Sequence, residues 1–189
     1  MVITNYGSSC LKLQSGENVL AIDPPPKGGP RFEAAVVLFT NPTGTHAHSL
    51  GGNPIEFSTP GEYETREISC TGFEGTDVTP FLIEWEGLRL FYLGAASHKE
   101  TLKTVLDRVD GADILFLSPE NNLPEVQKAV STIDPRIVVI VADPRLKKST
   151  DSFMRDMGEK PEVVTKLTIK KRMLPMEGQR LVVLDSERI

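Results

Sequence analysis

Apolar positions in the first half of the chain fall into short runs that end at glycine, proline or asparagine. Alternating or continuous apolar runs of this length, bounded by turn residues, predict strands rather than helices. Glu86-Gly87 stands between the last two runs and predicts a hairpin turn. The strands that we expect here are residues 1–6, 10–13, 19–22, 35–40, 55–59, 65–73, 80–86 and 88–93.

The second half alternates between helical and strand-like patterns. Residues 99–109 have apolar side chains at helical spacing, and 124–133 begin with a proline at the first helical position. A third helix is expected at 151–157, ended by Gly158. The strands between and after the helices are 114–117, 137–141, 164–171 and 181–184. This rhythm predicts a sheet covered by helices.

The most continuous apolar run, 35–40, leads into a loop rich in threonine, glycine and histidine that ends at His48. A run without polar alternation is typical of a strand that is buried on both faces. Loops that follow such strands are where ligands bind in layered α/β folds. Loop 41–48 is therefore the first candidate for a functional site.

Composition narrows the classes of function. The 189 residues fit one domain, 1–189, and the net charge of −5 argues against a nucleic-acid partner held by charge. No apolar run reaches the ~20 residues that span a membrane, and the start of the chain has no signal-like segment. We therefore expect a cytoplasmic protein with Cys10 and Cys70 as buried, unpaired thiols. The sequence leaves open whether the protein forms a homo-oligomer.

Three motifs resemble the metallo-β-lactamase fold superfamily. In that superfamily a strand runs into Thr-His-x-His-x-Asp-His, and here Thr40 begins a stretch in the same frame. Ile22-Asp23-Pro24 matches an early strand end, although Asp23 is interpreted here as a turn-capping carboxylate. Gly61-Glu62-Tyr63-Glu64 is similar to a hallmark of the small Zn-dependent-hydrolase branch related to L-ascorbate-6-phosphate lactonase. The resemblance spans 6–184 and implies an α/β fold, a four-layer αββα sandwich built from two sequence halves.

The same resemblance implies that most metal ligands have been lost. The family's ligand positions correspond to Asn41, Thr43, Thr45, His46, Ala95 and Ala142. Among them His46 alone keeps the family's residue type, whereas a catalytic zinc needs about three protein ligands. We expect no metal cofactor and no catalytic residues, and hence an inactive ligand-binding or interaction module. The residues expected to form its pocket are Asn41, Thr43, Thr45, His46, Ser97, His98 and Asp143.

Gly44 and its flanking threonines could offer backbone N–H groups and hydroxyls to an anion, which suits a small-molecule or anionic partner. One alternative is a hydrolase of esters, lactones or phosphoesters. It would hold one zinc ion on His46, His48 and His98, with an oxygen from Asp143, and the zinc would activate water. Another is a structural subunit that pairs with an active relative.

Overall fold

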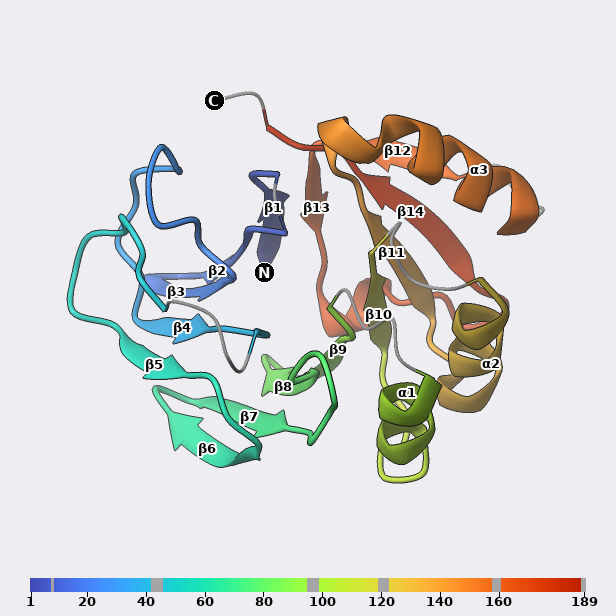
Figure 1. Cartoon of the computed structure of the whole chain (residues 1–189), viewed down its shortest axis with the longest axis horizontal. Helices are drawn as coiled ribbons and strands as arrows, with labels where there is room; N and C mark the ends of the chain where they lie inside the picture. The colour runs from blue at the N-terminus through green and yellow to red at the C-terminus, as the bar shows by residue number, and fades with distance from the viewer. Residues whose placement is uncertain (8, 42–45, 95–98, 119–122, 158–160, 188–189) are drawn as a thin grey trace.

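Two β-sheets face each other through the centre of the molecule, and helices cover one of them (Figure 1). The computed structural model describes residues 1–189 except 8, 42–45, 95–98, 119–122, 158–160 and 188–189. The predicted two-sheet α/β sandwich is confirmed. Its central core joins inward-facing side chains of both sheets, such as Leu13, Phe81 and Val139.

The six-stranded sheet is mixed. In spatial order, the strands are β13 (Lys166–Thr168), β1 (Val2–Asn5), β2 (Leu11–Ser15), β3 (Asn18–Ile22), β4 (Val36–Leu38) and β5 (Ile55–Phe57). Neighbouring strands are antiparallel from β13 to β3 and parallel from β3 to β5.

The strands of the eight-stranded sheet are, in spatial order, β12 (Glu162–Val164), β14 (Arg180–Leu184), β11 (Ile137–Val141), β10 (Ile114–Leu117), β9 (Leu88–Tyr92), β8 (Phe81–Trp85), β7 (Ile68–Gly72) and β6 (Gly61–Thr65). Neighbouring strands are parallel from β12 to β9 and antiparallel from β9 to β6.

The outer face of this sheet carries α1 (Lys99–Leu106), α2 (Leu123–Ile133) and α3 (Lys147–Met157). A short 3₁₀ turn, η1 (Pro144–Leu146), immediately precedes α3. A second 3₁₀ turn, η2 (Lys171–Met173), follows β13. Over the described residues, the outer face of the six-stranded sheet is covered by loops that bring Phe32, Ala34 and Leu50 against it. The fourth layer of the sandwich is therefore loop rather than helix there.

The side chains of β11 alternate between two cores. Val139 and Val141 point between the sheets, whereas Val138 and Ile140 point toward the helices, so the strand is buried on both faces as its unbroken apolar sequence predicts. The alternation continues past the strand, and Ala142 packs on the helix side.

The boundaries predicted from the sequence were wrong for two strands. The expected strand 65–73 is the second half of a hairpin, because Arg66 and Glu67 adopt left-handed φ angles of 51° and 63° and turn the chain between β6 and β7. The expected strand 164–171 is split between β12 and β13, which belong to different sheets. The two sheets therefore do not follow the two halves of the sequence.

Both cysteines are buried and unpaired, as predicted. Burial raises the pKa of each thiol to about 12, so neither is a thiolate at neutral pH. None of the helices in the described ranges is long and apolar enough to cross a membrane.

Candidate functional site

One edge of the sandwich brings the β1–β2 turn together with the ends of four strands, β3, β4, β9 and β11. Gly94, after β9, comes so close to Thr40, after β4, that a Cβ added to it would lie 3.5 Å from the threonine Oγ1. Thr40 also accepts a backbone hydrogen bond of 2.7 Å from Thr79. We call this edge the rim. Its described residues are Ser9, Asp23, Thr40, Asn41, His46, Tyr92, Asp143 and Arg145.

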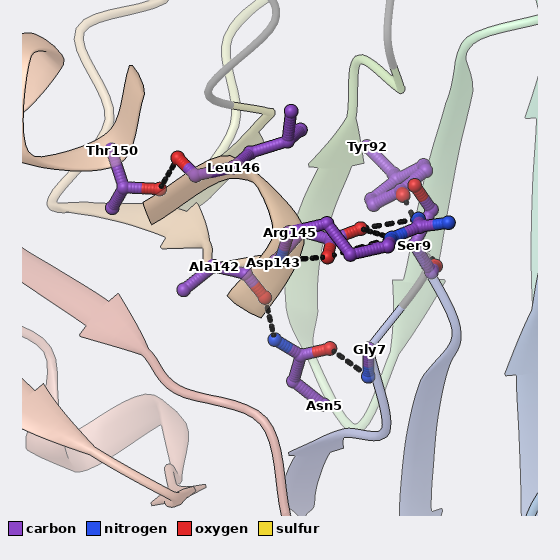
Figure 2. Close-up of polar contacts among 9 residues, drawn as sticks. All are labelled: Asn5, Gly7, Ser9, Tyr92, Ala142, Asp143, Arg145, Leu146 and Thr150. Carbon is purple, nitrogen blue, oxygen red and sulfur yellow. Dashed lines mark hydrogen bonds and ion pairs between the residues drawn. The ribbon is translucent and has the colours of Figure 1, made fainter. Parts of the chain in front are cut away.

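Asn5 anchors the rim from below (Figure 2). Its side chain is fully buried, and its Nδ2 donates to the carbonyls of Ala142 at 2.7 Å and Leu184 at 2.8 Å. Its Oδ1 accepts from the N–H of Gly7 at 2.8 Å. One amide thus joins the end of β1 to the ends of β11 and β14 and holds the following turn. A buried polar group with all its partners in place fixes such a geometry.

Asp23 holds the start of loop 41–48. It has a left-handed φ of 45°, and its two carboxylate oxygens accept from the N–H of Thr40 at 2.7 Å and from its hydroxyl at 2.6 Å. Burial raises the pKa of this carboxyl from 3.8 to about 6. The hydrogen bonds from Thr40 and the nearby His46 lower the pKa and only partly offset the burial.

This raised pKa predicts a specific pH dependence. Folded Asp23 keeps its proton to a higher pH than unfolded Asp23, so the free energy of unfolding falls as pH rises from about 4 to about 6. In Asp23→Asn the amide can still accept from the N–H of Thr40 and can donate to its hydroxyl, and asparagine tolerates the left-handed φ. Because the half-buried carboxyl is partly screened by water, we expect urea unfolding to show a gain of about 1–2 kcal/mol at about pH 8 and little change at about pH 4.

Asp107→Asn is the control for this pH dependence, since Asp107 is an exposed carboxyl after α1. It should change stability little at either pH. A gain in Asp23→Asn that is equal at both pH values would show that ionisation of Asp23 is not its cause.

His46 and His48 both lie against Phe39, with ring centroids 4.8 and 6.2 Å from the phenyl ring. Nε2 of His46 is 2.9 Å from the carbonyl of Asn41, so the structure brings these two predicted pocket residues together. His48 uses both ring nitrogens: Nδ1 accepts from the N–H of Leu50 at 3.3 Å, and Nε2 lies 3.1 Å from a carboxylate oxygen of Glu56. Binding a metal through His48 would disrupt this arrangement.

Asp143 lies at the opposite side of the rim and is paired with Arg145 (Figure 2). It is 8% exposed and caps η1 by accepting from the N–H of Arg145 at 2.9 Å. The guanidinium Nε of Arg145 also lies within 3.1 Å of both carboxylate oxygens. The arginine side chain is 71% exposed, so this ion pair meets solvent beside Ser9 and Tyr92.

The described rim residues and the adjoining Ala142 do not fit a zinc centre. Ala142 has no donor atom and faces the helices, and the carboxylate of Asp143 is bound by a guanidinium. No group of three or more His, Cys, Asp or Glu in the described part of the chain could hold an ion. Thr43, Thr45, Ser97 and His98 fall outside the described residues, so their place in a pocket stays a prediction.

Sequence reasoning missed Arg145 and Asn5. Asp143-Pro144-Arg145 does carry a signal, because an aspartate before a proline is a typical start of a helical turn, and its carboxylate then points back at the residue after the proline. Asn5 has no such signal for its long-range bonds, since the two carbonyls that accept from its Nδ2 lie more than a hundred residues away in the sequence.

Comparison with known proteins places these observations in a family. A family model described as a β-lactamase superfamily domain matches residues 2–142. A search of curated proteins gave no match. A solved structure from Thermotoga maritima, proposed to be a Zn-dependent hydrolase of the metallo-β-lactamase superfamily, is 21% identical, covers 98% of this chain and 99% of its own, and has a TM-score of 0.80.

Two further structures share the fold at lower similarity. An isothiocyanate hydrolase from Delia radicum gut bacteria is 11% identical with a TM-score of 0.61, over 90% of this chain and 99% of its own. A protein from Parabacteroides distasonis, proposed to be a metal-dependent hydrolase, is 15% identical with a TM-score of 0.55, over 82% of this chain and 89% of its own. At these identities the likeness concerns the fold.

Proposed function

Because the chain belongs to the metallo-β-lactamase superfamily, we propose that it is a member whose rim binds a small anionic ligand without a zinc centre and without hydrolysing it. The family supplies the framework and the expected position of the site. The side chains at that position determine the chemistry, and they differ in type from the ligands of a hydrolytic metal site.

The ion pair between Asp143 and Arg145 is the observation that carries this proposal. In the superfamily the end of this strand contributes a histidine ligand, which the resemblance places at Ala142. Here the strand end instead presents a carboxylate bound to a guanidinium. An arginine keeps its charge at any physiological pH, and its planar fork matches carboxylate and phosphate groups. The rim therefore presents a guanidinium that is largely exposed to solvent and held in place by the carboxylate beside it.

Four rim residues, and Asn5 beneath them, have a role in this proposal. Asp143 orients Arg145, and Asn5 fixes the backbone of Ala142 immediately before this pair. Asp23 and Thr40 hold the start of loop 41–48, which the sequence predicts to offer N–H groups and hydroxyls to an anion. These groups bind and orient a ligand, but none of them is a nucleophile or a general base for hydrolysis.

Hydrolysis assays test the catalytic half of the proposal. The purified protein, supplied with excess Zn²⁺ or Mn²⁺, is expected to cleave a nitrophenyl ester, a simple lactone and a phosphodiester at the rate of the buffer containing the same metal. The rate should be unchanged in His98→Ala. A metal-dependent rate above the buffer that His98→Ala abolishes would instead establish the hydrolase.

That hydrolase is the second candidate, with a mononuclear site on His46, His48 and His98. The packing of His46 and His48 against the same phenyl ring favours it, because it keeps two imidazoles near each other. The two contacts that His48 makes through its ring nitrogens weigh against it. A cytoplasmic location, a homo-oligomer and kinship with the lactonase branch stay predictions of the sequence.

A further inference from the structure

A cavity of about 530 Å³ lies between α3 and the ends of β11, β12 and β14. It is on the helix side of the eight-stranded sheet, because Ala142, Met154 and Val183 line it and belong to the core beneath the helices. In Figure 2 Ala142 and Thr150 lie on one side of Asp143, and the rim residues Ser9 and Tyr92 lie on the other. The cavity is therefore distinct from the rim and shares Asp143 with it.

Strand topology explains why a cavity forms here. β11 and β14 are parallel neighbours whose chains leave their carboxyl ends in different directions. After β11 the chain enters η1 and α3 on the helix side. After β14 it crosses to the other sheet, where Ser186 bridges to Asn5 and the N–H of Glu187 donates to the carbonyl of Asn5 at 2.7 Å. A crevice outside the carboxyl ends of diverging parallel strands is the usual ligand position in α/β sheets.

The charged groups of the lining favour a cation. The cavity is lined by three carboxylates, those of Asp143, Asp151 and Asp185, and by one ammonium group, that of Lys147. Lys147 lies 3.7 Å from Asp151 on the same helix, and Arg145 is paired with Asp143. Asp185 is exposed and accepts from the N–H of Ser186, and it has no cationic partner among the residues that the structure describes. Asp185 is thus the lining carboxylate best placed to accept a cationic ligand.

The apolar part of the lining favours a hydrophobic body. Val163 of β12 is 61% exposed although it lines the cavity, and Met154 reaches the same space from α3. The volume lies in the range of small-molecule sites, which combine apolar walls with a few polar groups. From the topology, the charges and these walls, we infer that the cavity binds a small organic cation, an amine joined to an apolar group. The ammonium group lies at Asp185 and the apolar group against Met154 and Val183.

Methyl NMR of the full chain labelled with ¹³C-methyl methionine tests this inference. Benzylamine is the probe, and benzyl alcohol and benzoate are its neutral and anionic counterparts. EDTA is present, so the outcome is independent of any metal at the rim. Met154→Leu identifies the Met154 signal. We expect benzylamine to shift that signal saturably in the millimolar range or below, and benzoate to leave it unchanged.

Asp185→Asn should weaken benzylamine binding about fivefold or more, because it removes the charge while keeping the size of the side chain. Asp107→Asn is the matched control and should leave the affinity unchanged, since Asp107 lies after α1 and does not line the cavity. The inference is overturned if no probe gives a saturable shift at Met154. It is also overturned if benzoate binds as well as benzylamine, or if Asp185→Asn and Asp107→Asn behave alike.

Discussion

Asn5→Ala is expected to lower the free energy of unfolding by about 3 kcal/mol. The substitution removes three hydrogen bonds of 2.7 to 2.8 Å from a fully buried side chain. It leaves the carbonyl of Ala142 and the N–H of Gly7 without this partner, whereas the carbonyl of Leu184 still accepts from the N–H of Ala142 at 3.1 Å. Buried polar groups that lose a partner cost more than the net worth of each bond. Urea denaturation followed by circular dichroism gives the free energy.

Gln14→Ala is the matched control, because it removes the same amide group from β2, where its hydrogen bond to the carbonyl of Gly16 is 3.4 Å long and exposed. It should change stability by no more than about 0.5 kcal/mol. If Asn5→Ala proved equally mild, the amide would not be the link that joins the two sheets at the rim.

Gly75→Ala is the second substitution with a large expected effect. A Cβ on Gly75 would lie 2.7 Å from Cγ2 of Thr101 and even closer to the carbonyl of Val78. Hydrogen bonds tie the loop that contains Val78 to Thr101 of α1: Oγ1 of Thr101 accepts from the N–H of Thr76 at 2.8 Å and donates to Asp77 at 3.0 Å. Since buried, hydrogen-bonded neighbours yield poorly, we expect a loss of about 2–3 kcal/mol by urea denaturation.

The effect should also reach the rim, because the same loop donates from Thr79 to the carbonyl of Thr40. Backbone NMR signals of Thr40 and Asn41 should therefore shift in Gly75→Ala. Gly178→Ala is the control: its φ of 71° strains any side chain, but nothing lies within 4 Å of the new Cβ. It should lose about 1 kcal/mol and leave the rim signals in place. Equal losses in the two variants would remove steric conflict as the cause.

The sequence predicted the type and order of most elements because apolar periodicity is a local signal. The unbroken run of β11 and the helical spacing of α1 follow directly from side-chain burial. Two features were not predicted from the sequence. The turn at Arg66 and Glu67 lacks glycine or asparagine, so the left-handed angles there have no local signature. The other is the position of β13, which joins the six-stranded sheet because it pairs with β1, far away in the sequence.

The candidate site likewise contains features that the sequence predicted and features that it did not. The sequence places Asp23, Asn41, His46 and Asp143 at strand ends, and all four lie at the rim. It gives no sign that a guanidinium binds Asp143, since the contact depends on the geometry of η1. The alternative zinc site uses His48 as a ligand, whereas Leu50 and Glu56 already hold the ring nitrogens of His48.

The most direct test of the central claim is the metal content of the protein, measured by elemental mass spectrometry. The protein is purified without chelator, incubated with excess zinc or manganese, and desalted. A rim in which Arg145 is the cation that binds Asp143 predicts a ratio of metal to protein near zero before and after incubation. A ratio near one that falls in His46→Ala or His98→Ala would contradict the account and establish a metal site at the rim.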